Sequence, residues 1–286
     1  MKKITNVFLF SSAFITLCAL AMVAQTADLF QLQNLNPFYF FFTAGGTMAS
    51  YNLHWYLTDT NVSNEISERY TWTHTHKQLL LPFAGIGMLM SLISFYFLIH
   101  YWLWIITGAI VAGLYTAPKI PGKVSTFLRK IAIAKTIYLA LAWTYVTAVL
   151  PLIISRQHIN FHSIAFILHR YFFIYALCIL FDYRDRDEDI GQGIRSLITM
   201  LNEKGIKVLF YVSLVSGILM ALFFYGIYSP SLKGILLCIP LLILAMLYNS
   251  IKKNKNDYLY YFAIDGLMLL SFLLTSFQQL SSFLWQ

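Results

Sequence analysis

The chain has 286 residues, of which 59% are hydrophobic and only 11% are charged. Soluble domains carry about 25% charged residues. This composition, with a mean hydropathy of +0.66, therefore excludes a soluble protein and predicts an integral membrane protein. The net charge of +8 would suggest nucleic-acid binding in a soluble protein; here we expect basic loops that face an anionic lipid leaflet and no nucleic-acid partner. The three cysteines lie in different apolar runs, which gives neither a disulfide framework nor metal-ligand spacing.

Apolar runs of spanning length follow one another along the chain, and we predict nine transmembrane helices in an all-α bundle. No connecting loop is long enough to fold separately, so residues 1–286 are predicted to form a single transmembrane domain. The first run could also be a signal peptide with an Ala-rich cleavage region; we expect a retained helix, because eight more runs follow. The predicted spans are Val7–Ala24, Pro37–Leu57, Gln78–Ile99, Tyr101–Ala117, Ile131–Ile154, Phe161–Phe181, Val208–Tyr228, Leu232–Tyr248 and Tyr258–Leu280.

The basic residues predict the orientation of these spans. With the N-terminus in the cytoplasm, all but Arg156, Arg170 and Lys233 of the 20 lysines and arginines fall in or beside cytoplasmic segments. This asymmetry follows the positive-inside rule. We therefore expect a bacterial inner (cell) membrane protein. Its segments 51–77, 115–130, 182–207 and 252–257 would share the cytoplasmic face.

The segment F-D-Y-R-D-R-D-E-D-I-G-Q-G-I-R-S-L, residues 181–197, holds five of the 12 acidic residues. On an α-helix, Asp182, Asp185 and Asp189 fall within an arc of about 60°. Three carboxylates on one stripe at the end of a membrane helix repel one another unless a cation lies between them. Hard oxygen ligands favour Mg²⁺, whose coordination shell is often completed by substrate phosphate. The pattern predicts a Mg²⁺ site; the alternative is a solvated charged loop.

The same residues resemble the second aspartate motif of the UbiA superfamily of intramembrane prenyltransferases. The resemblance runs from Arg170-Tyr171-Phe172-Phe173, through D-Y-R-D-R-D-E-D and Arg195-Ser196, to Gly205. It implies a UbiA-like bundle and Mg²⁺-dependent transfer of a prenyl group from an isoprenyl diphosphate to a lipid or aromatic acceptor in the membrane. Asp182, Asp185 and Asp189 would be the catalytic residues and the metal ligands, with the active site at the cytoplasmic face.

The first aspartate motif of that family is degenerate in this chain. In UbiA proteins an Asn at the end of the second helix is followed four and eight residues later by Asp, which gives a second Mg²⁺ site. Asn52 matches the Asn and is expected to contact metal and diphosphate, but Tyr56 and Thr60 replace the carboxylates. The alternative role for Asn52 is a polar helix end at the interface. Residues in the next loop that could supply carboxylate charge are Asp59, Glu65 and Glu68.

Further side chains on the predicted cytoplasmic face are candidates for binding the diphosphate. Tyr115 and Lys119 resemble the Tyr-x-x-x-Lys element that closes the fourth helix in UbiA-type enzymes. A Lys ammonium and a phenol can both donate to a diphosphate oxygen. The remaining candidates are the basic residues Arg69, Lys77 and Arg195.

Three hypotheses for function follow from the sequence. We favour the prenyltransferase. The second is a catalytically degenerate UbiA-fold protein that binds an isoprenoid lipid, which the two missing carboxylates favour. The third is a membrane transporter, since Arg170 and Asp265 lie within predicted spans, where charges are costly unless paired or hydrated. A transition-metal site at His54, His74 and His76 is disfavoured, because they lack acidic or Cys companions at a recognisable interval.

Overall fold

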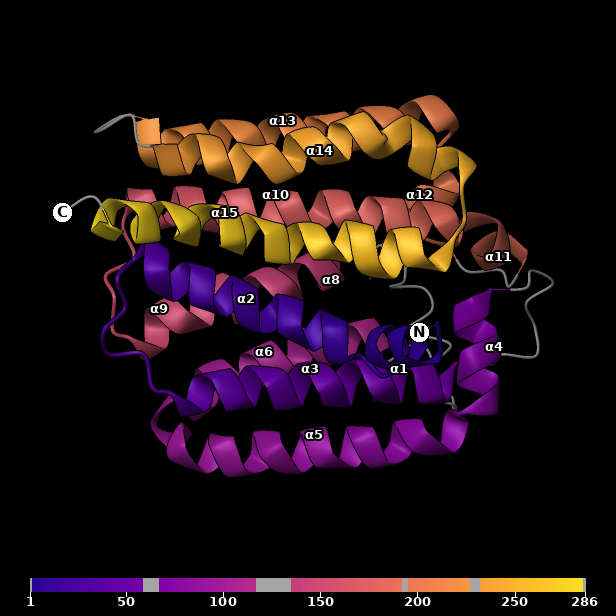
Figure 1. Ribbon diagram of the computed structural model, residues 1–286, viewed down its shortest axis with the longest axis horizontal. Coiled ribbons are helices and arrows are strands. Elements are labelled where there is room, and N and C mark those ends of the chain that lie inside the picture. Colours follow the sequence, from indigo (N-terminus) through magenta and orange to yellow (C-terminus); the bar gives the residue numbers. More distant parts are fainter. Residues whose placement is uncertain (1, 59–66, 117–134, 192–194, 227–231, 285–286) are drawn as a thin grey trace.

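The computed structural model describes residues 2–58, 67–116, 135–191, 195–226 and 232–284, and all regular structure in these ranges is helical. The long helices lie side by side, and their connections gather at opposite ends of the molecule (Figure 1). The helices are α1 (Lys2–Phe10), α2 (Ala13–Leu29), α3 (Phe38–Leu57), α4 (Glu68–Thr75), α5 (Lys77–Phe97), α6 (Trp102–Thr116), α8 (Lys135–Thr144), α9 (Leu150–Ile154), α10 (Phe161–Arg184), α11 (Arg186–Gly191), α12 (Leu197–Met200), α13 (Glu203–Gly226), α14 (Leu232–Lys253) and α15 (Asp265–Leu284). The prediction of an all-α membrane protein is confirmed for these residues.

The predicted number of nine spans is not confirmed. Among the described residues, six helices are long and apolar enough to cross a membrane, and a seventh span results if α1 and α2 are counted together. The helix α3 is long enough, with 20 residues, but it is not apolar enough to be counted with them, since its sequence holds Asn, His, Thr and Gly among the aromatics. The apolar segment Ile99–Gly113 is shorter than a full span.

The first predicted span is broken. The run Val7–Ala24 was expected to form one helix, but α1 and α2 meet at an angle of 52°. Ser12 at the break has a left-handed φ of 68°, a conformation that costs free energy for a residue with a Cβ. The backbone carbonyl of Ser11 accepts a hydrogen bond from Asn52 Nδ2 at 3.0 Å, so a side chain from α3 satisfies a backbone group that the break releases.

Packing joins the helices in a closed circuit. Along it, α5 packs on α3, α3 on α2, α2 on α15, α15 on α14, α14 on α13, α13 on α10, α10 on α8, α8 on α6, and α6 returns to α3. The closest approach is between α3 and α5: a Cβ at Gly45 would lie 2.5 Å from the Gly87 carbonyl oxygen. Small residues allow such backbone contact between membrane helices.

A buried polar network crosses the middle of the circuit and is centred on Arg170 of α10. Arg170 Nη2 donates to Gln25 Oε1 at 2.9 Å, and Nη1 donates to the Met22 carbonyl and to Thr147 Oγ1, each at 3.1 Å. Thr147 lies in a π-helical turn, Tyr145–Val149, a feature often found at functional positions. Gln25 Nε2 in turn donates to Ser271 of α15. Arg170 thus has neutral partners among the described residues, although its side chain is completely buried.

Candidate functional site at the polar end of the bundle

The acidic segment lies at the end of the bundle where α10 stops, together with α4, α11 and the connector 254–257; we call this the polar end (Figure 1). Asp182 is in the last turn of α10, Asp185 follows the helix as its C-cap residue, and Asp189 lies in α11. The backbone continues nearly helically, since the Asp189 amide donates to the Asp185 carbonyl at 2.9 Å. The three aspartates therefore follow one another along a nearly continuous helical backbone.

Asp182 and Asp189 share one cationic partner, Lys135 at the start of α8. Lys135 Nζ lies 3.2 Å from Asp182 Oδ1 and 3.4 Å from Asp189 Oδ2. The Thr136 hydroxyl also donates a hydrogen bond to Asp182 Oδ2. Both carboxylates are buried, with 6% and 7% of each residue exposed. Lys135 is therefore the counter-ion of two buried carboxylates.

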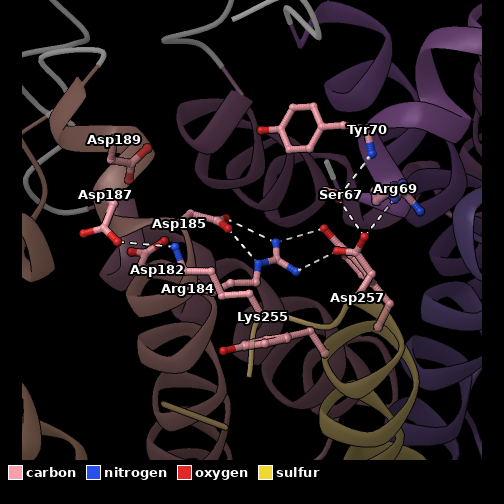
Figure 2. Close-up of polar contacts among 12 residues, drawn as sticks. Ser67, Arg69, Tyr70, Asp182, Arg184, Asp185, Asp187, Asp189, Lys255 and Asp257 are labelled. Atoms are coloured by element: carbon pink, nitrogen blue, oxygen red, sulfur yellow. Dashed lines mark hydrogen bonds and ion pairs between the residues drawn. The ribbon is translucent and has the colours of Figure 1, made fainter. Parts of the chain in front are cut away.

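Asp185 is turned to a different partner (Figure 2). Arg184 donates to it twice, from Nε to Oδ1 at 2.7 Å and from Nη2 to Oδ2 at 3.3 Å. Arg184 Nη2 also donates to the Tyr261 hydroxyl at 3.0 Å, and its Nη1 lies 3.6 Å from Asp257 Oδ1. The three aspartates, predicted to lie within an arc of about 60°, therefore have different partners. Asp182 and Asp189 bind Lys135, whereas Asp185 binds Arg184.

Arg69 lies in the same end of the bundle but is buried, with 2% exposed. Its guanidinium carbon is 4.4 Å from the ring centroid of Trp55, 5.1 Å from Tyr261 and 5.2 Å from Phe10. Burial lowers the pKa of Arg69 to about 10, which leaves it charged at neutral pH. The aromatic faces stabilise that charge, so the structure places this predicted diphosphate ligand inside an aromatic cage.

Asn52 is fully buried beside the break between α1 and α2. Its Nδ2 donates to the carbonyls of Ser11 and Met48, and its Oδ1 has no hydrogen-bond partner within the described ranges. In the structure the amide of Asn52 therefore binds the backbone at the break between α1 and α2. No cluster of three His, Cys, Asp or Glu side chains that could hold a metal occurs within those ranges.

The other predicted site residues are dispersed. Lys77 Nζ lies 5.4 Å from the ring centroid of Tyr56, and Arg195 is exposed just before α12. Glu68 accepts a hydrogen bond from the Tyr258 hydroxyl at 2.7 Å rather than approaching the aspartates. Tyr115 is in the last turn of α6. The predictions for Asp59, Thr60, Glu65 and Lys119 lie outside the described residues.

The fit of these residues to Mg²⁺ is partial. The oxygens of Asp182 and Asp189 converge on one ammonium group, and two carboxylates are a common protein contribution to a Mg²⁺ site. Asp185 would have to leave Arg184 to join them. The pair Asp182 and Asp189 therefore suits a cation, whereas Asp185, the third predicted carboxylate, is not grouped with them in a site of three among the described residues.

Lys135, Arg184 and Asp257 are the residues that sequence reasoning missed. Each carries a charge at the end of a predicted span. The positive-inside rule already explains a basic residue at such a position, and a single carboxylate there does not indicate a site. Their partners are 54 residues away for Lys135 with Asp189 and 188 residues away for Asp257 with Arg69. The only available signal was that all three lie on the predicted cytoplasmic face.

A pH dependence follows from Asp189. Burial raises the pKa of its carboxyl from 3.8 to about 6, because the nearby Lys135 offsets only part of the effect. Between these two values the folded chain holds a proton that the unfolded chain releases, so this group makes folding less favourable as the pH rises through the window. We expect the unfolding midpoint of the wild type to fall, relative to that of Asp189→Asn, between about pH 4 and pH 6.

The comparison should be made in detergent, with unfolding followed over that pH range for both proteins. Asp187→Asn is the matched control, since Asp187 is in the same segment but its side chain is 77% exposed. Parallel pH profiles for the wild type and Asp189→Asn would contradict the assignment.

Comparison with known proteins adds no assignment: no protein-family model matches the chain, and no curated protein matches it.

Proposed function

We propose that this chain is a Mg²⁺-dependent intramembrane prenyltransferase that binds an isoprenyl diphosphate at the polar end. The observation that carries the proposal is the pair of buried carboxylates, Asp182 and Asp189, which converge on a single cation. Two buried carboxylates with one ammonium between them retain a net negative charge and favour additional positive charge. The resemblance of residues 170–205 to the UbiA superfamily supplies the reaction class.

The residues of the polar end suit such a ligand. Mg²⁺ held by Asp182 and Asp189, with Asp185 beside them, would supply the charge that stabilises a departing diphosphate. Lys135 is within reach of both carboxylates, and a lysine displaced from them is a compact donor for phosphate oxygen. Lys119 and Tyr115 remain proposed ligands for the far oxygens.

The proposed reaction needs little covalent chemistry from the protein. The bond between the prenyl C1 and the bridging oxygen breaks, and its electron pair leaves with the diphosphate. The acceptor forms the new bond to C1 and loses a proton. Tyr171 and Tyr175 of α10 stack at 5.6 Å between ring centroids, about two to three helical turns inward from Asp182. Such aromatic faces favour positive charge and exclude water from an allylic cation.

The second candidate is a protein that binds the isoprenoid diphosphate without transferring it. The specific observation in its favour is that Lys135 already neutralises part of the charge of Asp182 and Asp189. The uncharged Tyr56 and Thr60, which replace the two carboxylates of the first motif, also favour binding without transfer. Release of diphosphate distinguishes the two candidates, because only transfer produces it.

The test uses the full chain in nanodiscs with labelled farnesyl diphosphate, in Mg²⁺ and in EDTA. We expect Mg²⁺-dependent binding that weakens by about tenfold to a hundredfold in Asp182→Asn and in Asp189→Asn, since each amide loses the charge that a hard cation requires. Asp187→Asn is the control and should bind like the wild type, because Asp187 is exposed and paired with Lys255. Binding that is independent of Mg²⁺ and equal in all variants would refute the proposal.

A further inference from the structure

Asp257, in the connector between α14 and α15, joins three parts of the polar end that are distant in the sequence. The residue is 6% exposed. Its Oδ2 accepts hydrogen bonds from Ser67 Oγ at 2.7 Å and from the backbone amide of Arg69 at 2.8 Å. Its Oδ1 faces Arg184 Nη1 at 3.6 Å. Figure 2 shows the carboxylate between these two groups.

On one side, Asp257 holds the first turn of α4. The first amides of a helix lack partners within the helix and carry partial positive charge, so a carboxylate there stabilises it. Ser67 caps α4 by accepting from the Tyr70 amide, and Asp257 binds both the cap hydroxyl and the next free amide. Because α4 is only eight residues long, its stability depends on such tertiary contacts.

On the other side, Asp257 holds Arg184, whose side chain is 9% exposed. Two nitrogens of Arg184 bind Asp185, and the third has no hydrogen bond within the described ranges and is aimed at Asp257. The guanidinium is planar and its donors are fixed relative to one another. The contact of Nη1 with Asp257 therefore helps to set the direction in which Nε and Nη2 point towards Asp185. The direction in which Asp185 points is thereby tied to Asp257.

We propose that Asp257 is a positioning residue that fixes α4 against the acidic segment and, through Arg184, fixes the carboxylate of Asp185. Its effect on ligand binding rests on the proposed function, whereas its effect on α4 does not. The consequence is that α4, with Arg69, and the C-terminal end of α10 are held together as one unit at the polar end.

Two substitutions separate the charge of Asp257 from its hydrogen bonds. Asp257→Asn keeps an oxygen that can accept from Ser67 and Arg69 but removes the attraction to Arg184. Asp257→Ala removes both. Asp257→Glu restores the charge and serves as the rescue variant. Asp28→Asn is the control, since Asp28 forms an ion pair with Lys233 at 3.8 Å at the opposite end of the bundle.

The first measurement is hydrogen exchange of the amides of residues 69–75 in nanodiscs without ligand. We expect protection to fall by about tenfold to a hundredfold in Asp257→Ala, the range for losing a hydrogen bond to a charged group. The loss should be smaller in Asp257→Asn and absent in Asp28→Asn. Unchanged protection of α4 in Asp257→Ala would overturn the proposal.

The second measurement is the affinity for farnesyl diphosphate with Mg²⁺ in Asp257→Asn, Arg184→Gln and the double variant. We expect each single variant to bind about tenfold more weakly and the double variant to lose little more, because both changes break the same link. Partial recovery in Asp257→Glu would exclude a general loss of folding. Additive losses, or wild-type affinity in Asp257→Asn, would overturn the positioning role. A wild-type chain that binds no farnesyl diphosphate would refute the proposed function and leave the exchange result to decide on α4.

Discussion

Arg170→Ala is expected to lower the free energy of unfolding by about 3–5 kcal/mol, because it removes the donor of a buried acceptor and leaves a cavity. The substitution leaves Gln25 Oε1 without the donor that now lies 2.9 Å away, whereas the Met22 carbonyl still accepts from the Thr26 hydroxyl at 3.1 Å. Each buried acceptor left unpaired costs about 1–3 kcal/mol, and hydrocarbon around the bundle offers no replacement. The loss of a completely buried side chain adds a cavity.

Unfolding in bicelles, measured by steric trapping or by SDS titration, tests this expectation. Arg156→Ala is the matched control, because Arg156 is the same residue type in an exposed position. The double variant Arg170→Met with Gln25→Leu should be more stable than Arg170→Ala, since it fills the volume and removes the unpaired acceptor. Equal stability of Arg170→Ala and Arg156→Ala would show that the network contributes nothing to the fold.

Lys135→Met is expected to make the protein dependent on divalent cations. Without the ammonium, the carboxylates of Asp182 and Asp189 remain buried with no cation between them, a loss of about 3–5 kcal/mol in the absence of metal. Lys135 lowers the pKa of Asp189, so its removal should raise that pKa further. Mg²⁺ no longer competes with an ammonium, so we expect it to bind about tenfold to a hundredfold more tightly.

The measurement is the unfolding midpoint of Lys135→Met and of the wild type over a Mg²⁺ titration. Lys233→Met is the matched control: its side chain is 19% exposed, against 23% for Lys135, and it pairs with Asp28 at the far end. A midpoint that rises with Mg²⁺ only in Lys135→Met supports cation binding by the aspartate pair. Identical Mg²⁺ responses in all three proteins would remove the pair as a cation site.

The sequence by itself determined the class of the protein and the approximate place of its helices. Long apolar runs must be helical in a bilayer, because every backbone group needs a partner within the segment. The acidic segment was also located correctly at the end of a helix, since α10 ends at Arg184. The spacing of Asp182 and Asp189 placed both on one face, and the structure brings both to Lys135. These are local properties, and a helical repeat encodes them.

Only the tertiary structure decided which charge neutralises which. Asp185 turned from its neighbours to Arg184, Arg69 entered an aromatic cage, and Arg170 bound Gln25 across 145 residues. The break at Ser12 likewise depends on Asn52 of another helix to satisfy the Ser11 carbonyl. A buried charge takes the partner that the neighbouring helices bring within reach, at a cost of desolvation that depends on the whole surrounding. The periodicity of one helix contains no information about which helix packs against it. The sequence therefore predicted that charges gather at the polar end, whereas the packing of the helices determined which charges pair.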